Sequence, residues 1–190
     1  MDELHNMVKL ESGVSQFRIK EAERNDAPVF NLYEQAELED DLSGIRTSKD
    51  PKKIRTNDRV SILKEGDVVF GLISGKCAVV KPWHSGYLFS QNYVRLSPLP
   101  SVDPHFLAFL LNENDVIKLQ LHVGRQGSSV KKHTVKQLAN LQMPDLPPLD
   151  TQKIIGCLYF NQLELTAHKK RHADSETIFM IEKLKEASRR

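Results

Sequence analysis

The last forty residues limit the fold of this chain more than any other segment. Residues 146–149 read Leu-Pro-Pro-Leu, a stiff extended linker. Asp150 then offers a helix cap, and Gly156 is the only poor helix former between 151 and 190. A continuous helix of that length spans about 60 Å at the standard rise, more than a compact domain of the preceding residues needs. We therefore expect a globular domain at residues 1–149 and a long spacer or dimerisation helix at 150–190.

Apolar residues recur every seven positions along the expected helix. Leu158, Leu165 and Phe179 follow this period, and His172 occupies the position of the repeat between Leu165 and Phe179. A seven-residue period is typical of a coiled-coil seam, so these four residues are the predicted interface with a second helix. Polar residues interrupt the seam at 168–170, which leaves a frayed amphipathic tail as the alternative.

Residues 1–149 combine short strands, glycine turns and a few helices. Runs at 60–63 and 68–73 are separated by a glycine-containing turn and suggest a hairpin, and further strands are expected at 77–80, 87–90 and 93–96. Asp103 and Pro104 form a helix start, and Gly44 is expected to end an acidic helix. The sequence predicts an α+β fold, with a compact, strongly curved β-sheet, packed helices and a long C-terminal helix of the coiled-coil type.

The formal net charge of +2 hides an uneven distribution. Residues 1–50 carry 12 acidic and 6 basic side chains, whereas residues 51–149 carry 7 acidic and 13 basic ones. The intervals 68–102 and 116–144 contain no acid at all. An acidic start followed by a basic middle indicates a face that meets a polyanion, with a dipolar solvated surface as the other interpretation.

Lysine, arginine, glutamine and serine cluster in the acid-free intervals, between glycines that favour loops. Basic side chains neutralise DNA phosphates, and arginine and amide side chains bond to base edges in the grooves. These properties favour DNA over other polyanions. The candidate DNA-contacting residues are Lys76, Lys81, Trp83, His84, Arg125, Gln126, Ser128, Lys131, Lys132 and His133.

The sequence contains no complete catalytic motif, so we expect a chain that is not an enzyme. Cys77 with His84 lacks a third orienting group, and Cys77 opens an apolar strand, which favours a buried packing residue. His168 and His172 have the i, i+4 spacing of zinc ligands, but three cations separate them and no metal site is expected. No signal peptide, membrane span or paired-cysteine motif is evident, which predicts a cytoplasmic protein without a membrane partner.

Several motifs together resemble the target-recognition domain of the specificity subunit of type I restriction–modification systems. Residues 63–69 (Leu-Lys-Glu-Gly-Asp-Val-Val), 91–96, 103–111 and 127–130 follow the family's order, as do 138–144. Residues 146–155, which hold the two prolines and then Gln152 and Ile154, are similar to the family's junction before its helix. Each motif is weak alone, but their order and spacing cover nearly the whole chain.

The resemblance implies a non-catalytic subunit that binds double-stranded DNA and directs a methyltransferase subunit, and in some complexes a restriction subunit, to a bipartite target. It implies no cofactor in this chain, since adenosylmethionine would be bound by the partner methyltransferase. Family members usually carry two recognition domains and two helices, and this sequence has one of each. That difference implies a half-subunit that forms a homodimer through antiparallel helices and reads an interrupted palindrome.

Two other hypotheses remain open from the sequence. The chain could be a non-catalytic interaction module that binds an acidic protein through its basic face and oligomerises through the C-terminal helix. It could also be a metal-dependent hydrolase that uses His168 and His172. Salt-dependent DNA binding supports the specificity subunit over the first alternative, and metal analysis tests the second.

Overall fold

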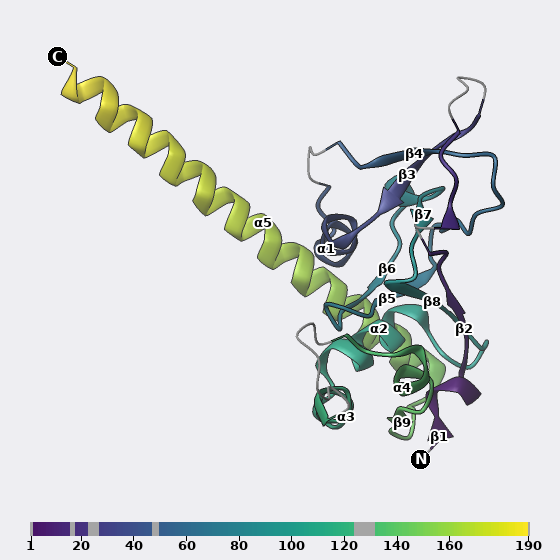
Figure 1. The fold of residues 1–190 in the computed structure, drawn as a ribbon. Helices are drawn as coiled ribbons and strands as arrows, with labels where there is room; N and C mark the ends of the chain where they lie inside the picture. The colour runs from purple at the N-terminus through teal and green to yellow at the C-terminus, as the bar shows by residue number, and fades with distance from the viewer. Residues whose placement is uncertain (1, 16–17, 23–26, 47–49, 124–131, 190) are drawn as a thin grey trace.

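The computed structural model describes residues 2–15, 18–22, 27–46, 50–123 and 132–189. The described residues up to 148 form a globular part, and the last helix projects from it (Figure 1). The strands are β1 (Asp2–Glu3), β2 (Val8–Ser12), β3 (Val29–Tyr33), β4 (Lys53–Arg55), β5 (Val68–Gly71), β6 (Cys77–Val79), β7 (Leu88–Phe89), β8 (Tyr93–Pro98) and β9 (Gln142–Met143). The α-helices are α1 (Gln35–Ser43), α2 (Pro104–Glu113), α3 (Asp115–Val123), α4 (Val135–Ala139) and α5 (Leu149–Ser188), and short 3-10 turns lie at Leu4–Asn6 and Pro82–His84.

The largest sheet has the strand order β2-β8-β5-β6, with every neighbouring pair antiparallel. All four residues of β5 are buried, because both faces of the sheet are covered. Val68 and Phe70 face the core that includes Leu107 and Leu111 of α2. Val69 points to the other face, into a core with Leu38 of α1. The two-residue period of a strand thus divides β5 between two apolar clusters.

Two smaller sheets complete the strands of the described residues. The order β4-β3-β7 joins an antiparallel pair to a parallel pair, and β1 pairs with β9. The α+β class and the long C-terminal helix are confirmed. The expected single sheet is instead distributed over these three sheets, and its strong curvature stays a prediction.

The expected hairpin between residues 60–63 and 68–73 is wrong. Val68 pairs with Val79 of β6 and with Leu96 of β8. The earlier run bonds elsewhere: the Leu63 amide donates to the Tyr87 carbonyl at 2.8 Å, and Ile62 makes an isolated bridge to Leu88. The turn at residues 64–67 has the length of a hairpin turn but connects two different sheets, because the strands that pair with its two flanking runs lie later in the chain.

Helix ends follow the local sequence signals closely. The Asp103 carboxylate accepts a hydrogen bond from the Phe106 amide at 2.9 Å, with Pro104 at the first helical position of α2. α1 ends at Gly44, whose φ of 70° lies in the left-handed region that glycine adopts freely. The start of α5 differs from expectation. Pro148 precedes the helix, and Asp150 lies in its first turn rather than at its cap, where an acid interacts favourably with the helix dipole.

α5 has two dissimilar halves. Its first turns pack against α2 and α1, which buries Gln152, Gly156 and Phe160. From His168 onward its residues are exposed, and this half extends away from the globular part (Figure 1). None of the helices in the described part of the chain combines the length and hydropathy needed to cross a membrane.

Candidate nucleic-acid interface

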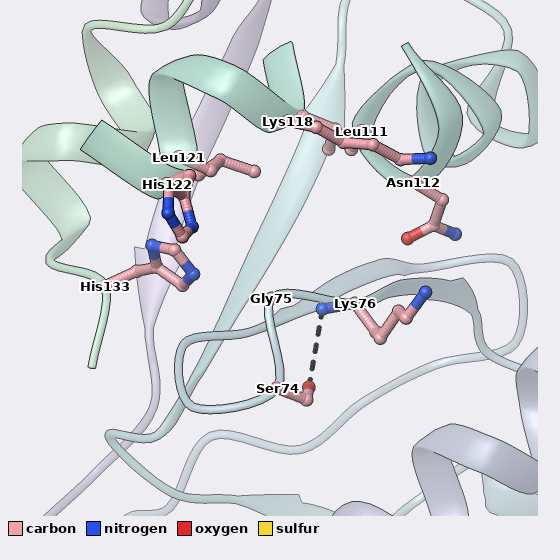
Figure 2. Close-up of a pocket in the computed structure, with 9 residues that line it drawn as sticks. All are labelled: Ser74, Gly75, Lys76, Leu111, Asn112, Lys118, Leu121, His122 and His133. Atoms are coloured by element: carbon pink, nitrogen blue, oxygen red, sulfur yellow. Dashed lines mark hydrogen bonds between the residues drawn. The ribbon is translucent and has the colours of Figure 1, made fainter. Parts of the chain in front are cut away.

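A basic pocket lies where the turn before β6 faces α2 and α3. Its volume is about 230 Å³, and lysine and histidine side chains supply all its ionisable lining groups. The lining residues are Ser74, Gly75, Lys76, Leu111, Asn112, Lys118, Leu121, His122 and His133 (Figure 2). His122 and His133 lie together at one end, and Lys76 and Lys118 extend toward Asn112 at the other. We call this the basic pocket.

The turn that carries Lys76 is held by side-chain and backbone bonds. Gly75 donates its amide to the Gly71 carbonyl at 2.8 Å and has a φ of 69°, which favours glycine at that position. Cys77, the residue after Lys76, is held by Asn112 of α2. The Asn112 side chain accepts from the Cys77 amide at 2.8 Å and donates to the Cys77 carbonyl at 2.7 Å. The Lys76 side chain stays exposed. This arrangement fixes the backbone at Lys76 while leaving its charge in solvent.

Cys77 itself is fully buried, which confirms its interpretation as a packing residue. Burial raises the pKa of the Cys77 thiol strongly, because the thiolate would lose its hydration. A thiol with a raised pKa is a poor nucleophile near neutral pH.

Lys118 belongs to a small polar network at the mouth of the basic pocket. Its ammonium lies 2.9 Å from a Glu113 carboxylate oxygen, and the Tyr159 hydroxyl of α5 donates to the other oxygen at 3.1 Å. Burial acts to raise the pKa of Glu113, but the bonds from Lys118 and Tyr159 outweigh it and the net shift is downward. The pair is nearly half exposed, so a stronger anion can compete with Glu113 for Lys118.

The basic pocket is lined by residues on both sides of the glycine-rich segment 124–131, which contains four of the ten predicted DNA contacts. Arg125, Gln126, Ser128 and Lys131 lie outside the described residues. The chain enters this segment after His122 and Val123 and leaves it at Lys132, and His122 and His133 both line the pocket. Lys132 is exposed and donates to the Asn92 amide oxygen at 2.8 Å. Among the described candidates, Lys132 therefore adjoins the glycine-rich segment, and Lys76 lines the basic pocket.

His133 is buried, with only 2% of its surface exposed, although its sequence context suggested a DNA contact. Its backbone amide donates to the Leu72 carbonyl at 2.8 Å, and its ring packs edge-on against Phe70 at 6.0 Å. Direct contact with a groove needs exposed polar atoms, so little of this ring is available, and the predicted DNA contact of His133 stays a prediction.

Lys81, Trp83 and His84 form a second group at the other end of β6. The His84 ring nitrogen Nδ1 lies 2.7 Å from Asp41, and the pair is almost wholly buried. Asp41 also accepts from the Tyr33 hydroxyl at 2.9 Å and from the Lys81 amide at 3.1 Å. Burial raises the pKa of Asp41 despite these bonds. His84 thus joins the Pro82–His84 turn to α1, and its contact with DNA stays a prediction, with little of the ring accessible.

Lys81 faces a different surface from Lys76. It lines a cavity of about 170 Å³ against the first half of α5, together with Lys153 and Glu164. Trp83 is half-buried and packs against His84, with ring centroids 6.2 Å apart. The described candidates therefore fall into two groups, separated by the length of β6.

Two residues of the basic pocket, Lys118 and His122, were not among the predicted contacts. Both lie in the acid-free interval and are four residues apart, so a helix places them on one face. The helical spacing was the available signal, but it does not reveal that this face of α3 turns toward the start of β6.

The four predicted interface residues of α5 are exposed. The exposed fractions are 62% for Leu158, 46% for Leu165 and 60% for Phe179, and the His172 side chain is 77% exposed. His168 and His172 lie within 4 Å of Glu164 and Glu176 respectively. Within the described ranges, no three histidine, cysteine or acidic residues converge as a metal site.

Comparison with solved structures shows the same fold in larger proteins. The HsdS subunit from Thermoanaerobacter tengcongensis aligns with a TM-score of 0.61 and 18% identity over 96% of this chain and 41% of that one. A structure described as the basis of complex assembly and conformational transition of the type I R-M system gives 0.59 and 19%, over 96% and 42%. The type I S subunit from M. genitalium gives 0.51 and 13%, over 95% and 41%. The chain thus spans about two fifths of each.

A search of curated proteins found no match. A family model did match: the type I restriction modification DNA specificity domain aligns with residues 8–171, which include every strand from β2 to β9 and the first half of α5. On this match the chain belongs to the family of type I restriction modification DNA specificity domains.

Proposed function

We propose that this chain is the DNA-reading specificity subunit of a type I restriction–modification system and has no catalytic role of its own. The basic pocket, which is lined by His122 and His133 on either side of the glycine-rich segment, is the observation that carries this proposal. Its lining contains lysines and histidines but no carboxylate, and phosphate neutralisation needs such a surface. Membership of the specificity-domain family supports DNA as the polyanion.

In this proposal the globular part reads one half of an interrupted target. Lys76, Lys118 and Lys132 neutralise phosphates near the pocket, and the segment with Arg125, Gln126, Ser128 and Lys131 reaches the bases. Lys81 and Trp83 make a separate contact at the other end of β6. The methyltransferase subunit binds adenosylmethionine and modifies the DNA, and a restriction subunit cleaves it, so this chain needs no cofactor.

A second copy of the chain would supply the other half-site. Leu158, Leu165 and Phe179 expose apolar surface on a helix that projects beyond its own globular part, and water makes such surface costly to leave uncovered. An antiparallel pair of α5 helices would cover these side chains and hold two globular parts apart. The resulting two-fold symmetry matches a palindromic target with a central spacer.

DNA binding by charge variants tests the proposal. The purified chain with its methyltransferase partner should bind duplex DNA, with a steep loss of affinity as salt increases. Lys76→Ala and Lys118→Ala should each lower the affinity and reduce the salt slope by about one unit, because each removes one phosphate contact. Fluorescence anisotropy over a salt series gives both quantities.

Lys9→Ala is the matched control. Lys9 is an exposed lysine on β2, at the opposite edge of the four-stranded sheet from β6, so its loss should leave the slope unchanged. Absence of DNA binding at low salt with the partner present would contradict the proposal. Binding that DNA competitor does not displace would instead favour an acidic protein as the ligand.

A further inference from the structure

The junction between the globular part and α5 is built around one buried amide. Gln152 is 2% exposed, and its Nε2 donates to the Pro147 carbonyl at 2.8 Å and to the Ser101 carbonyl at 3.1 Å. Its Oε1 accepts from the Asp103 amide at 3.0 Å. Asp103 is also the cap of α2, so one side chain ties the starts of α2 and α5 together.

One turn further along, α5 touches the backbone of α2 directly. A Cβ atom at Gly156 would lie 2.6 Å from the Phe106 nitrogen and 2.8 Å from the His105 carbonyl carbon. Ordinary contacts of a Cβ atom begin near 3.4 Å, so no other residue fits without moving one helix. Glycine is unfavourable inside a helix, and here the close helix crossing explains its presence.

Beyond Gly156, α5 contacts the globular part for two more turns and then has no further contact with it among the described residues. The Phe160 ring meets His105 edge-on at 5.1 Å, and Glu164 packs against Gly44 at the end of α1. From His168 to Arg189 the residues of α5 are exposed. The direction of the projecting half is therefore set by the contacts between Gln152 and Glu164.

We propose that Gln152 and Gly156 are positioning residues that set the separation between the two DNA half-sites. The inference rests on the proposed function, because it requires two globular parts on one target. α5 acts as a lever: Gln152 and Gly156 lie about 6 Å apart along the axis, and Ser188 lies about 48 Å beyond Gly156. A displacement of about 1 Å at Gly156 tilts the helix about Gln152 by about 10° and moves its end, about 54 Å from Gln152, by about 9 Å. That distance equals roughly two to three base pairs of DNA.

A distance measurement within one chain tests the lever without DNA. Spin labels at Asn57→Cys and Ser188→Cys, in a Cys157→Ala background, report the distance between the globular part and the end of α5. Both label sites are exposed, whereas Cys77 is buried. The labelled chain is diluted into excess unlabelled chain, so that only distances within one chain are read. Gly156→Ala should shift the distance by several ångströms, and by about 9 Å at most if the helix tilts as a rigid rod.

Selection of DNA targets with varied central spacers tests the consequence. Wild type should prefer one spacer length, and Gly156→Ala should move the preference by one base pair or more, or broaden it over several lengths. Thr151→Ala is the control, since it places the same residue at an exposed position of the same helix. The control should keep both the wild-type distance and the wild-type spacer.

The outcomes of these two experiments test the positioning role of Gly156 and the proposed function separately. An unchanged label distance in Gly156→Ala overturns the inference, and so does a changed distance with an unchanged spacer preference. If Gly156→Ala does not fold, Gln152→Ala carries the same test, because it removes the three hydrogen bonds without crowding α2. If wild type neither dimerises nor binds DNA, the proposed function fails, while the label distance still shows whether the junction directs α5.

Discussion

Asp41 shows how a single buried residue changes the role of its neighbours. It contacts Tyr33, Lys81 and His84 at once, and two of these lie about forty positions away in the chain. Histidine in a loop between a tryptophan and a serine is a reasonable DNA contact from the sequence alone. The carboxylate that draws His84 inward lies in α1, so no local pattern around His84 could reveal its burial.

At the residue scale, the Glu11–Arg95 pair gives a pH-dependent prediction. Arg95 bonds to Glu11 of β2 and to Asp67, and its hydrogen bond to Glu11 lowers the pKa of that carboxyl from 4.5. A lowered folded-state pKa adds stability above the unfolded-state pKa, and this stability is lost as the pH falls through the folded-state pKa. Glu11→Gln should therefore lower the free energy of unfolding at pH 7 by less than about 1 kcal/mol, because the pair is partly exposed.

Urea unfolding of wild type and Glu11→Gln at pH 7, 4 and 3 checks this prediction. The difference in unfolding free energy should shrink as the pH falls and vanish once Glu11 is protonated in the folded state. Glu65→Gln, at an exposed position in the turn before β5, serves as the control. A difference that stays constant down to pH 3 would show that Glu11 stabilises the fold by something other than its charge.

At the element scale, Asn112 completes the edge of the largest sheet. β6 is an edge strand of the order β2-β8-β5-β6, and edge strands leave backbone groups without a strand partner. The Asn112 amide bonds to both the amide and the carbonyl of Cys77, as a neighbouring strand would. The helix α2 thus covers this edge and holds the turn that presents Lys76.

Asn112→Leu should lower the free energy of unfolding by about 3 kcal/mol, since it leaves two buried backbone groups of Cys77 unsatisfied. Asn112→Asp should cost less than Asn112→Leu only at low pH, where the protonated carboxyl keeps both an acceptor and a donor, because a buried carboxylate would lose its hydration and face the Cys77 carbonyl oxygen. Chemical denaturation of both variants measures the order. Equal stability of Asn112→Leu and wild type would show that the two hydrogen bonds are dispensable.

Local signals predicted the elements well, and long-range pairing was the part they missed. The cap at Asp103, the end of α1 at Gly44 and the length of α5 depend on residues within one or two turns, and all three were evident from the sequence. The predicted hairpin between residues 60–63 and 68–73 was wrong because a turn sequence does not determine which distant strand a run of residues pairs with. For the candidate nucleic-acid interface, the exposed residues Lys76 and Lys132 were predicted from the sequence. Lys118 was not, because its position in the basic pocket depends on how α3 packs against the rest of the chain.

At the scale of the whole molecule, the exposed face of α5 offers a direct test of the proposed homodimer. Leu158→Glu combined with Leu165→Glu should convert a dimer into a monomer, because the charges would oppose each other in a shared apolar seam. Light scattering should then give a mass near 21.7 kDa instead of twice that value. Compared as monomers at low concentration, wild type and variant should melt at the same temperature, since neither leucine is buried in the single chain.

Ile178→Glu is the matched control for this change. Ile178 is 64% exposed but lies about 100° around the helix from Phe179, so a glutamate there should leave the dimer intact. A wild-type chain that stays at its monomer mass at the highest concentration tested would contradict the dimer.

The exposed second half of α5 links assembly to folding. A lone helix of about twenty residues is marginal in water, because helix propagation barely exceeds the cost of nucleation. This half makes its own backbone hydrogen bonds but receives no support from the globular part. Its helix content should therefore increase with chain concentration, visible as a deeper circular dichroism minimum at 222 nm. Dilution would then shorten the ordered helix before the globular part loses any structure.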